Sequence, residues 1–221
     1  MATQSSQRLD QFVDAAFAFS VTLLIISDGA PDSLDALLNA LLRAPAFAMS
    51  FSLIAMFWLA HREYSRLAGG SSAWSTSLSL AMVFTVLVYV FPLRVLSESG
   101  FHALSGGFLP GRDLLGSFDD LRTLYIVYAS AFVVLSTLYV LLFSTAVANP
   151  RDDQALGPAK EWRGIMALLL CAGVLSAALA LTLPLQAVPW APGVSYGIIP
   201  IGIGLMSALG SGRKRPTDVR E

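Results

Sequence analysis

The sequence predicts an all-α integral membrane protein with six transmembrane helices. Of its 221 residues 55% are hydrophobic and only 13% are charged, and the mean hydropathy is +0.66. A soluble domain typically carries about a quarter charged residues. Apolar runs approach the roughly 20 residues that a helix needs to cross a bilayer core about 30 Å thick. The period-2 alternation of β-strands is not sustained anywhere, which favours helices throughout.

Six segments are predicted to cross the membrane, at residues 10–27, 44–61, 74–93, 124–148, 164–185 and 194–209. A Gly- and Ser-rich connection is predicted over residues 97–120. The last segment is short and contains Pro200, so we expect it to be kinked and packed against protein. We predict one six-helix transmembrane domain at residues 1–212 and a short basic tail at residues 213–221.

The basic residues are distributed unevenly between the two predicted sides of the membrane. Ten of the 14 Lys and Arg residues fall on the side of the two termini. The other four are Arg43, Arg94, Arg112 and Arg122. The positive-inside rule therefore predicts that both termini are cytoplasmic. Acidic residues outnumber basic ones on the far side, which fits either a cation-attracting vestibule or ordinary solvated loops.

The composition argues against several other classes of function. One cysteine and two histidines leave no plausible metal site, and we expect Cys171 to be a small buried apolar residue. The hydroxyls of Ser136, Thr137 and Ser176 have no nearby base in the sequence, so an enzyme is not expected. We also expect no cofactor and no nucleic-acid partner. The basic tail is expected to anchor the last helix, or alternatively to contact lipid headgroups.

The first predicted span carries the functional hypothesis. Its residues Arg8, Phe12, Ala15, Phe19, Thr22 and Ile26 follow one another at steps of three and four, typical of a helix that packs against copies of itself. Around a common axis, Phe19 would form an apolar constriction and Thr22 a ring of hydroxyl oxygens. Leu23 and Ile26 would narrow the path again. The same spacing also fits packing inside a single bundle, with the Thr22 hydroxyl bonded to its own backbone.

Residues 8–24 resemble the signature first helix of the transmembrane protein 175 family, the lysosomal potassium channels and their bacterial relatives. Arg8, Phe12 and Asp14 fit the family pattern Arg-x-x-x-Phe-Ser-Asp, and the segment ends in the matching Thr-Leu-Leu. Trp58 and His61 fit the family's Trp-x-x-His at the end of the second span. Val13 stands where the family has serine, which removes a hydroxyl from the motif's hydrogen-bond network.

This resemblance implies a potassium-selective channel with a non-canonical potassium channel fold in a bacterial plasma membrane. Four subunits would form a homotetramer in the lipid bilayer, with the first helix of each lining a central pore for potassium ions. Phe19, Leu23 and Ile26 fall at the family's hydrophobic constriction, which acts as gate and filter. Thr22 falls at the threonine associated with potassium preference. An ion-coupled secondary transporter remains the alternative, with the Pro200 segment as a candidate broken helix.

The charged and polar residues of the motif are predicted to support the pore helix. Asp14 lies off the seam and is expected to face the second span, where Trp58 and His61 come within reach. Such a polar cluster would set the rotation of the first helix. Arg8 is expected to pair with an acid at the cytoplasmic mouth. The alternative is a snorkelling Arg8 with Trp58 and His61 at the membrane interface.

Overall fold

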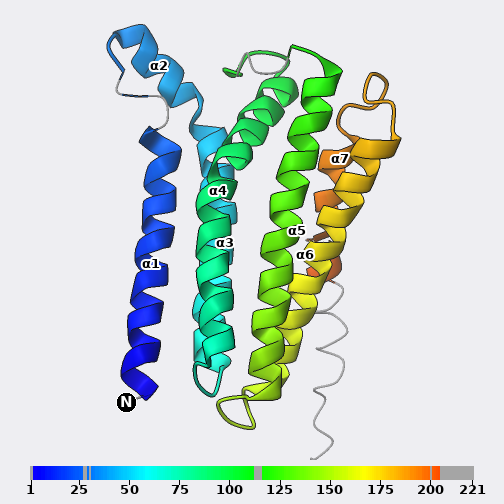
Figure 1. Ribbon diagram of the computed structural model, residues 1–221. Coiled ribbons are helices and arrows are strands. Elements are labelled where there is room, and N and C mark those ends of the chain that lie inside the picture. The colour runs from blue at the N-terminus through cyan, green and yellow to red at the C-terminus, as the bar shows by residue number, and fades with distance from the viewer. Residues whose placement is uncertain (1, 27–28, 30, 112–115, 200, 205–221) are drawn as a thin grey trace, which may run out of the picture.

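Long helices run side by side in a bundle in the computed structural model, with α1 at one edge (Figure 1). The structure describes residues 2–26, 29, 31–111, 116–199 and 201–204. The helices are α1 (Ala2–Ile26), α2 (Leu34–Leu42), α3 (Ala44–Leu67), α4 (Ala73–Leu104), α5 (Phe118–Ala148), α6 (Leu156–Thr182) and α7 (Ala191–Val194), followed by the 3₁₀ turn η1 (Ser195–Gly197). No strand longer than an isolated bridge occurs in these ranges.

Four helices, α3 to α6, are long and apolar enough to cross a membrane. The predicted class of all-α membrane protein is therefore confirmed. Helix α1 has 25 residues, a length of about 37 Å, and residues 191–204 form a shorter apolar helix. The first and last of the six spans stay predictions. The predicted basic tail at 213–221 and the end of the last span lie outside the described residues.

Serine side chains begin several helices at the positions where local chemistry requires a cap. Ser72 accepts a hydrogen bond from the backbone N–H of Ser75, and the Ser75 side chain accepts one from the N–H of Ser72. Ser117 accepts from the N–H of Asp120 at the start of α5. These bonds satisfy backbone donors that have no partner inside the helix. Asp119 and Asp120 add favourable negative charge to the same first turn.

The connection predicted over residues 97–120 is partly wrong, because α4 continues to Leu104. The helix passes through Pro92 and buries Glu98, while the Ser97 hydroxyl bonds Ser50 of α3 at 3.0 Å. These tertiary contacts outweigh the Ser- and Gly-rich local composition. The chain leaves the helix at Gly106, whose φ of 63° is a left-handed conformation that glycine adopts without strain. Helix α2 is a further element that was not predicted.

Different interhelical loops lie at the two ends of the bundle. We call the end where α1, α4 and α6 begin the proximal end, and the opposite end the distal end (Figure 1). At the proximal end the α3–α4 and α5–α6 loops pair, with Gly69 N–H donating to the Asn149 carbonyl at 2.9 Å. A Cβ on Gly69 would lie 2.8 Å from the Pro150 carbonyl oxygen, so this approach requires glycine. Which end is cytoplasmic stays a prediction.

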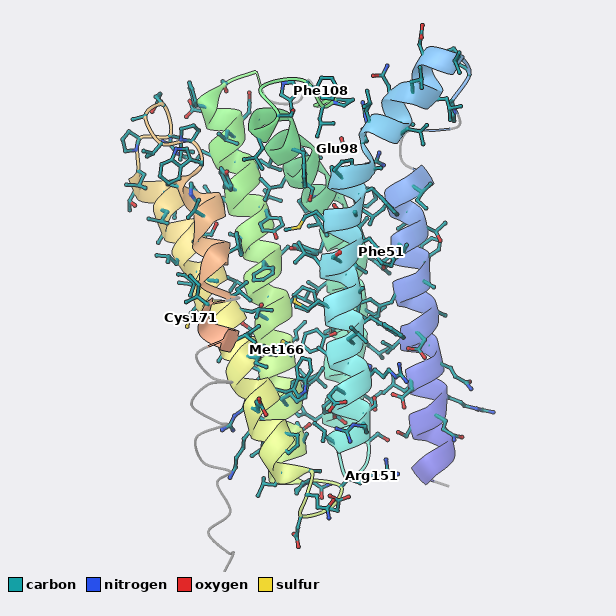
Figure 2. The ribbon with its side chains drawn as sticks, turned by 180° about the vertical axis from the view of Figure 1, so that it is seen from behind. Phe51, Glu98, Phe108, Arg151, Met166 and Cys171 are labelled. Carbon is teal, nitrogen blue, oxygen red and sulfur yellow. The ribbon has the colours of Figure 1, made fainter. Side chains whose placement is uncertain are left out.

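An aromatic core joins α3, α4 and α5. The Phe57 ring lies 5.5 Å from Tyr139 and 5.8 Å from Phe132, and the Tyr139 hydroxyl donates to the Phe57 carbonyl. Helix α6 packs closely on α5 through Gly173, where a Cβ would meet Val133 at 2.9 Å. The burial predicted for Cys171 is wrong, since its side chain is exposed (Figure 2). The neighbouring residues of α6 turn toward α5 instead and leave Cys171 on the outer face.

Candidate pore helix and its supporting contacts

Helix α1 has two faces of different character. Val13, Phe17 and Leu24 are buried against α3 and α4 and belong to the main apolar core. Ser20 shares this face and satisfies its hydroxyl on the Ala16 carbonyl at 2.8 Å. The steps of four, three and four between these residues are those of one helix face. The opposite side of α1 is therefore turned away from the rest of the chain.

The predicted seam lies on this outward face. Phe12 and Phe19 are 52% and 56% exposed, and Arg8, Ala15 and Thr22 are also exposed. A helix that packed its seam inside a single bundle would bury these aromatic rings, so the structure does not support that alternative for Phe12 and Phe19. A large apolar surface on one helix face marks a site of contact with protein or lipid.

Two other residues of the predicted constriction are placed differently. Leu23 is only partly exposed and packs against the apolar core, so it sits at the edge of the outward face. The side chain of Ile26 lies outside the described part of the structure. The neighbouring Ile25 is 61% exposed near the distal end of α1.

The Thr22 hydroxyl donates to the Ala18 carbonyl one turn earlier, at 3.0 Å. This bond to its own helix was part of the alternative interpretation, yet the residue remains on the exposed face. A hydroxyl that donates its only proton keeps its oxygen lone pairs as acceptors. Thr22 thus presents an acceptor oxygen outward, which suits a cation and does not suit an anion.

Asp14 is tied to α3. The Trp58 indole N–H donates to Asp14 Oδ1 at 2.7 Å, as expected for an aspartate on the flank of the helix. The Arg62 guanidinium lies over the Trp58 ring at 5.8 Å and so stacks on the same indole. A short hydrogen bond to a carboxylate is among the stronger polar contacts in proteins. This contact fixes one point of α1 against α3.

His61 does not join Asp14 through a hydrogen bond. It is buried, and its Nε2 lies 3.2 Å from the Ser79 hydroxyl of α4. His61 therefore links α3 to α4, while a contact that the sequence analysis missed links α3 to α1. The Ser65 hydroxyl donates to Asp10 Oδ1 at 2.6 Å. The Ser65–Asp10 contact could have been predicted from spacing. Asp10 precedes Asp14 by one turn, and Ser65 follows Trp58 by two turns on the same face.

The remaining motif residues, Val13 and Arg8, make no polar side-chain contact among the described residues. Val13 is fully buried in the apolar core, so the position where the family pattern has serine is filled here by packing. Arg8 is exposed, and the described residues show no ion pair for it. The predicted pairing of Arg8 with an acid is therefore not found in this part of the chain.

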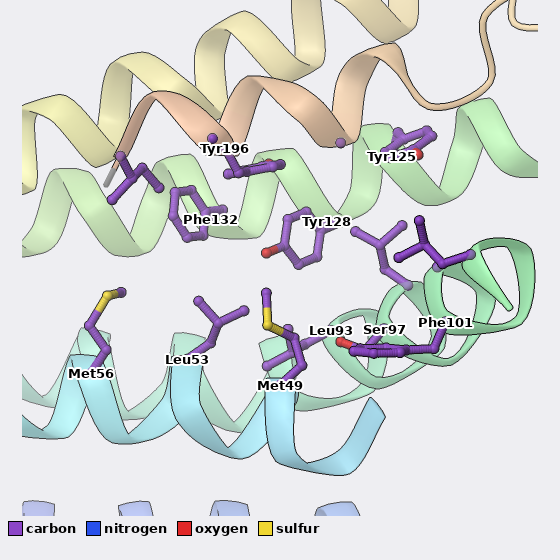
Figure 3. Close-up of a pocket in the computed structure, with 16 residues that line it drawn as sticks. Met49, Leu53, Met56, Leu93, Ser97, Phe101, Tyr125, Tyr128, Phe132 and Tyr196 are labelled. Carbon is purple, nitrogen blue, oxygen red and sulfur yellow. The ribbon is translucent and has the colours of Figure 1, made fainter. Parts of the chain in front are cut away.

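Two cavities border the helices. A cleft of about 630 Å³ near the proximal end is lined by polar residues that include Asp10, Asp14, His61 and Arg62. A second cavity of about 550 Å³, between α3, α4, α5 and η1, is lined by Met49, Met56, Tyr128 and other apolar or aromatic residues (Figure 3). No residue of α1 lines the second cavity, so it is separate from the predicted ion path.

Within the described residues, no group of three His, Cys, Asp or Glu could hold a metal ion.

The fold and this helix define an all-α membrane protein with one helix mounted at the edge of a bundle and its apolar seam facing outward. Residues 8–92 match the model of the family described as the endosomal/lysosomal potassium channel TMEM175. The resemblance predicted from the first helix is thereby confirmed. The matched residues contain α2, α3 and most of α1 and α4, and so include both halves of the motif.

Similar proteins extend this comparison. A protein of Marivirga tractuosa named "Potassium channel" is 31% identical over 91 residues, which are 41% of this chain and 37% of that protein. The crystal structure of a variant of the potassium channel MtTMEM175 matches with a TM-score of 0.75 and 21% identity, over 93% of each chain. A lysosomal potassium-selective channel TMEM175 homolog from Chamaesiphon minutus matches with a TM-score of 0.61 and 21% identity, over 92% of this chain and 98% of that one. The whole fold is therefore shared with these channels.

Proposed function

We propose that this protein is a potassium-selective cation channel whose ions pass between α1 helices of four identical subunits. The observation that carries the proposal is the outward face of α1, where Phe12, Ala15, Phe19 and Thr22 are exposed while the opposite face is buried. In a membrane, helices associate through close van der Waals packing, and a continuous seam on one face offers a surface for such contact between copies of the chain. The names of the similar proteins, all potassium channels, support a channel over an enzyme.

The size of a helix supports a constriction at Phe19. Four helices packed about 9 Å apart at the corners of a square have their axes about 6 Å from the centre. A helix with its side chains has a radius of about 5–6 Å, so average side chains nearly reach the centre. Four phenyl rings at Phe19 exceed that average and would close the path to a hydrated ion. Such an apolar ring gates by dewetting.

Thr22 lies one turn beyond Phe19 on the same exposed face. Its proton is held by the Ala18 carbonyl, which leaves acceptor oxygens for a cation that has lost part of its water shell. Leu23 and Ile26 are proposed to complete the constriction toward the distal end. In this arrangement both termini face the cytoplasm of a bacterial cell, in agreement with the bias of basic residues.

The proposal is tested by ion flux in liposomes that contain the purified protein and carry potassium or sodium gradients. Phe19→Ala is expected to raise the potassium flux because it opens the apolar ring. Thr22→Ala is expected to reduce the preference for potassium over sodium because it removes the acceptor oxygen. If neither variant changes flux or selectivity, α1 does not line the path and the proposal fails.

Helix α4 offers matched controls for both variants. Phe84 is 69% exposed, so Phe84→Ala removes a phenyl ring that is at least as exposed as Phe19 but lies on a helix outside the proposed path. The Thr85 hydroxyl bonds the Ala81 carbonyl at 2.8 Å, so Thr85→Ala repeats the loss of a hydroxyl bonded one turn back. Both control variants are expected to conduct like the wild type.

A secondary transporter is the second candidate, and the interrupted last helix favours it. The 3₁₀ turn Ser195–Gly197 separates α7 from the following helical residues, and Ser195 is buried within this break. Carriers bind their substrates at such broken helices. Single-channel recordings separate the two functions, because discrete current steps require a continuous pore. Their absence, with slow saturable flux, would favour the carrier.

A further inference from the structure

An arginine of α4 holds the distal end of α1. Arg94 Nη1 donates to the backbone carbonyl of Leu24 at 2.6 Å. Leu24 lies in the last turn of α1, where carbonyl groups have no partner within the helix. The same turn is the negative end of the helix dipole, so a guanidinium there is favourable. This contact lies toward the opposite end of α1 from the Asp14–Trp58 contact.

A buried carboxylate orients this arginine. Glu98, one turn beyond Arg94 on α4, is 2% exposed and accepts from Arg94 Nε at 2.8 Å. Its second oxygen lies 3.8 Å from Arg43 Nη1, at the junction between α2 and α3. Figure 2 shows Glu98 at the distal end of the bundle beside the start of α3. The cluster of Arg43, Arg94 and Glu98 therefore joins three helices at one place.

We propose that Arg94, oriented by Glu98, is a positioning residue that sets the rotation of the distal half of α1 and with it the direction of Thr22. The inference rests on the proposed function for its effect on ions. Leu24 follows Thr22 by two residues, whereas the Asp14–Trp58 contact lies about 15 Å away toward the proximal end. The polar contacts of Asp10 and Asp14 with α3 both lie in the proximal half of α1 and leave its distal end without a polar contact to α3. The Arg94 contact adds one at the distal end, so that polar contacts flank the segment that carries Phe19 and Thr22.

The geometry requires arginine rather than a positive charge alone. Nε of Arg94 faces Glu98 while Nη1 faces the Leu24 carbonyl, so one planar group makes two bonds in different directions. A lysine ammonium is a point charge on a flexible stem and does not reproduce this fork. Arg94→Lys is therefore expected to behave like Arg94→Gln. A role based only on charge predicts instead that Arg94→Lys behaves like the wild type.

The experiment combines a structural readout with a functional one on the full-length protein. Hydrogen–deuterium exchange is measured for residues 18–26, and the potassium-to-sodium permeability ratio is measured in liposomes, for Arg94→Gln, Arg94→Lys and Glu98→Gln. Loss of the charge-assisted bond is expected to speed exchange of this segment by about tenfold. The permeability ratio is expected to fall toward one while the assembled size stays that of the wild type.

Arg122 of α5 provides the matched control. Its Nε donates to the Ala180 carbonyl of α6 at 3.1 Å, and it pairs with Asp119 at 3.2 Å. Arg122→Gln thus removes an arginine of the same kind from another helix end at the distal side. Exchange in residues 18–26 and the permeability ratio are expected to match the wild type in this variant.

Three outcomes overturn the proposal. The first is unchanged exchange and unchanged selectivity in well-assembled Arg94 variants. The second is a wild-type-like Arg94→Lys. The third is failure of all three variants to assemble, which would make the cluster a general stability element. A wild-type protein that conducts no ions would overturn the proposed function instead, while the exchange rates would still decide whether Arg94 holds α1.

Discussion

The contact between Asp14 and Trp58 leads to the most direct test of how α1 is held. Trp58→Phe removes the indole N–H but keeps an aromatic ring at the interface with α1. The lost bond is 2.7 Å long and ends on a carboxylate. Bonds to charged groups contribute about 1.5–3 kcal/mol, and we take roughly 1 kcal/mol here because Asp14 is exposed in the single chain and is partly screened. For a chain of this size, about 1 kcal/mol corresponds to roughly 2–4 °C in Tm.

The assay is a double-mutant cycle on the purified protein, with thermal unfolding followed by circular dichroism. Trp58→Phe and Asp14→Ala are measured singly and together. Because the two side chains share this bond, the Tm of the double variant is expected to fall by about 2–4 °C less than the sum of the two single losses. Trp74→Phe makes the same chemical change at an exposed position of α4 and is expected to show no coupling to Asp14→Ala. Additive losses in Trp58→Phe and Asp14→Ala would refute the reasoning.

Three further predictions concern the packing among helices α3 to α6. His61→Ala removes a buried ring and leaves the Ser79 hydroxyl without its partner, so we expect the free energy of unfolding to fall by roughly 2 kcal/mol and conduction to weaken. Wild-type values of both Tm and liposome flux would contradict this prediction. Tyr139→Phe removes the hydroxyl that donates to the Phe57 carbonyl in the core, and its Tm is expected to fall by an amount equivalent to about 1 kcal/mol, whereas an unchanged Tm would exclude that bond. Gly173→Val places a side chain against α5, and we expect reduced yield of assembled protein by size-exclusion chromatography, with Gly157→Val as a control at an open position.

Much of the candidate site could be predicted because α1 carries its information in short-range spacing. The steps of three and four placed Phe12, Phe19 and Thr22 on one face, and the structure exposes all three. The same periodicity placed Asp14 toward α3, where Trp58 donates to it. In a helix the spacing of residues along the sequence decides which face each side chain lies on, so these inferences needed no knowledge of neighbouring helices.

The partner of each polar group depended on how the helices pack, and spacing does not report this. His61 pairs with Ser79 of α4 instead of Asp14, because its side of α3 faces α4 and is buried there. The continuation of α4 to Leu104 was missed because it depends on Ser97 and Glu98, whose partners lie on α3 and at its start. Cys171 was expected to be buried because cysteine is a small apolar residue. The sequence of an apolar membrane helix does not indicate which of its sides faces lipid, so the exposed position of Cys171 was missed.

Hydropathy and helical period are local properties, and they were enough to predict the membrane class, most of the helical segments and the common face of the α1 seam residues. The contact that holds the distal end of α1 became evident only in the folded chain. Its distal contact runs from Arg94 to a backbone carbonyl of Leu24, about 70 residues away in the chain. Every residue has a backbone carbonyl, so no pattern of residue types in the sequence indicates which carbonyl will accept this bond. The physical reason is that packing brings remote backbone and side chains together, and only the folded chain shows which ones meet.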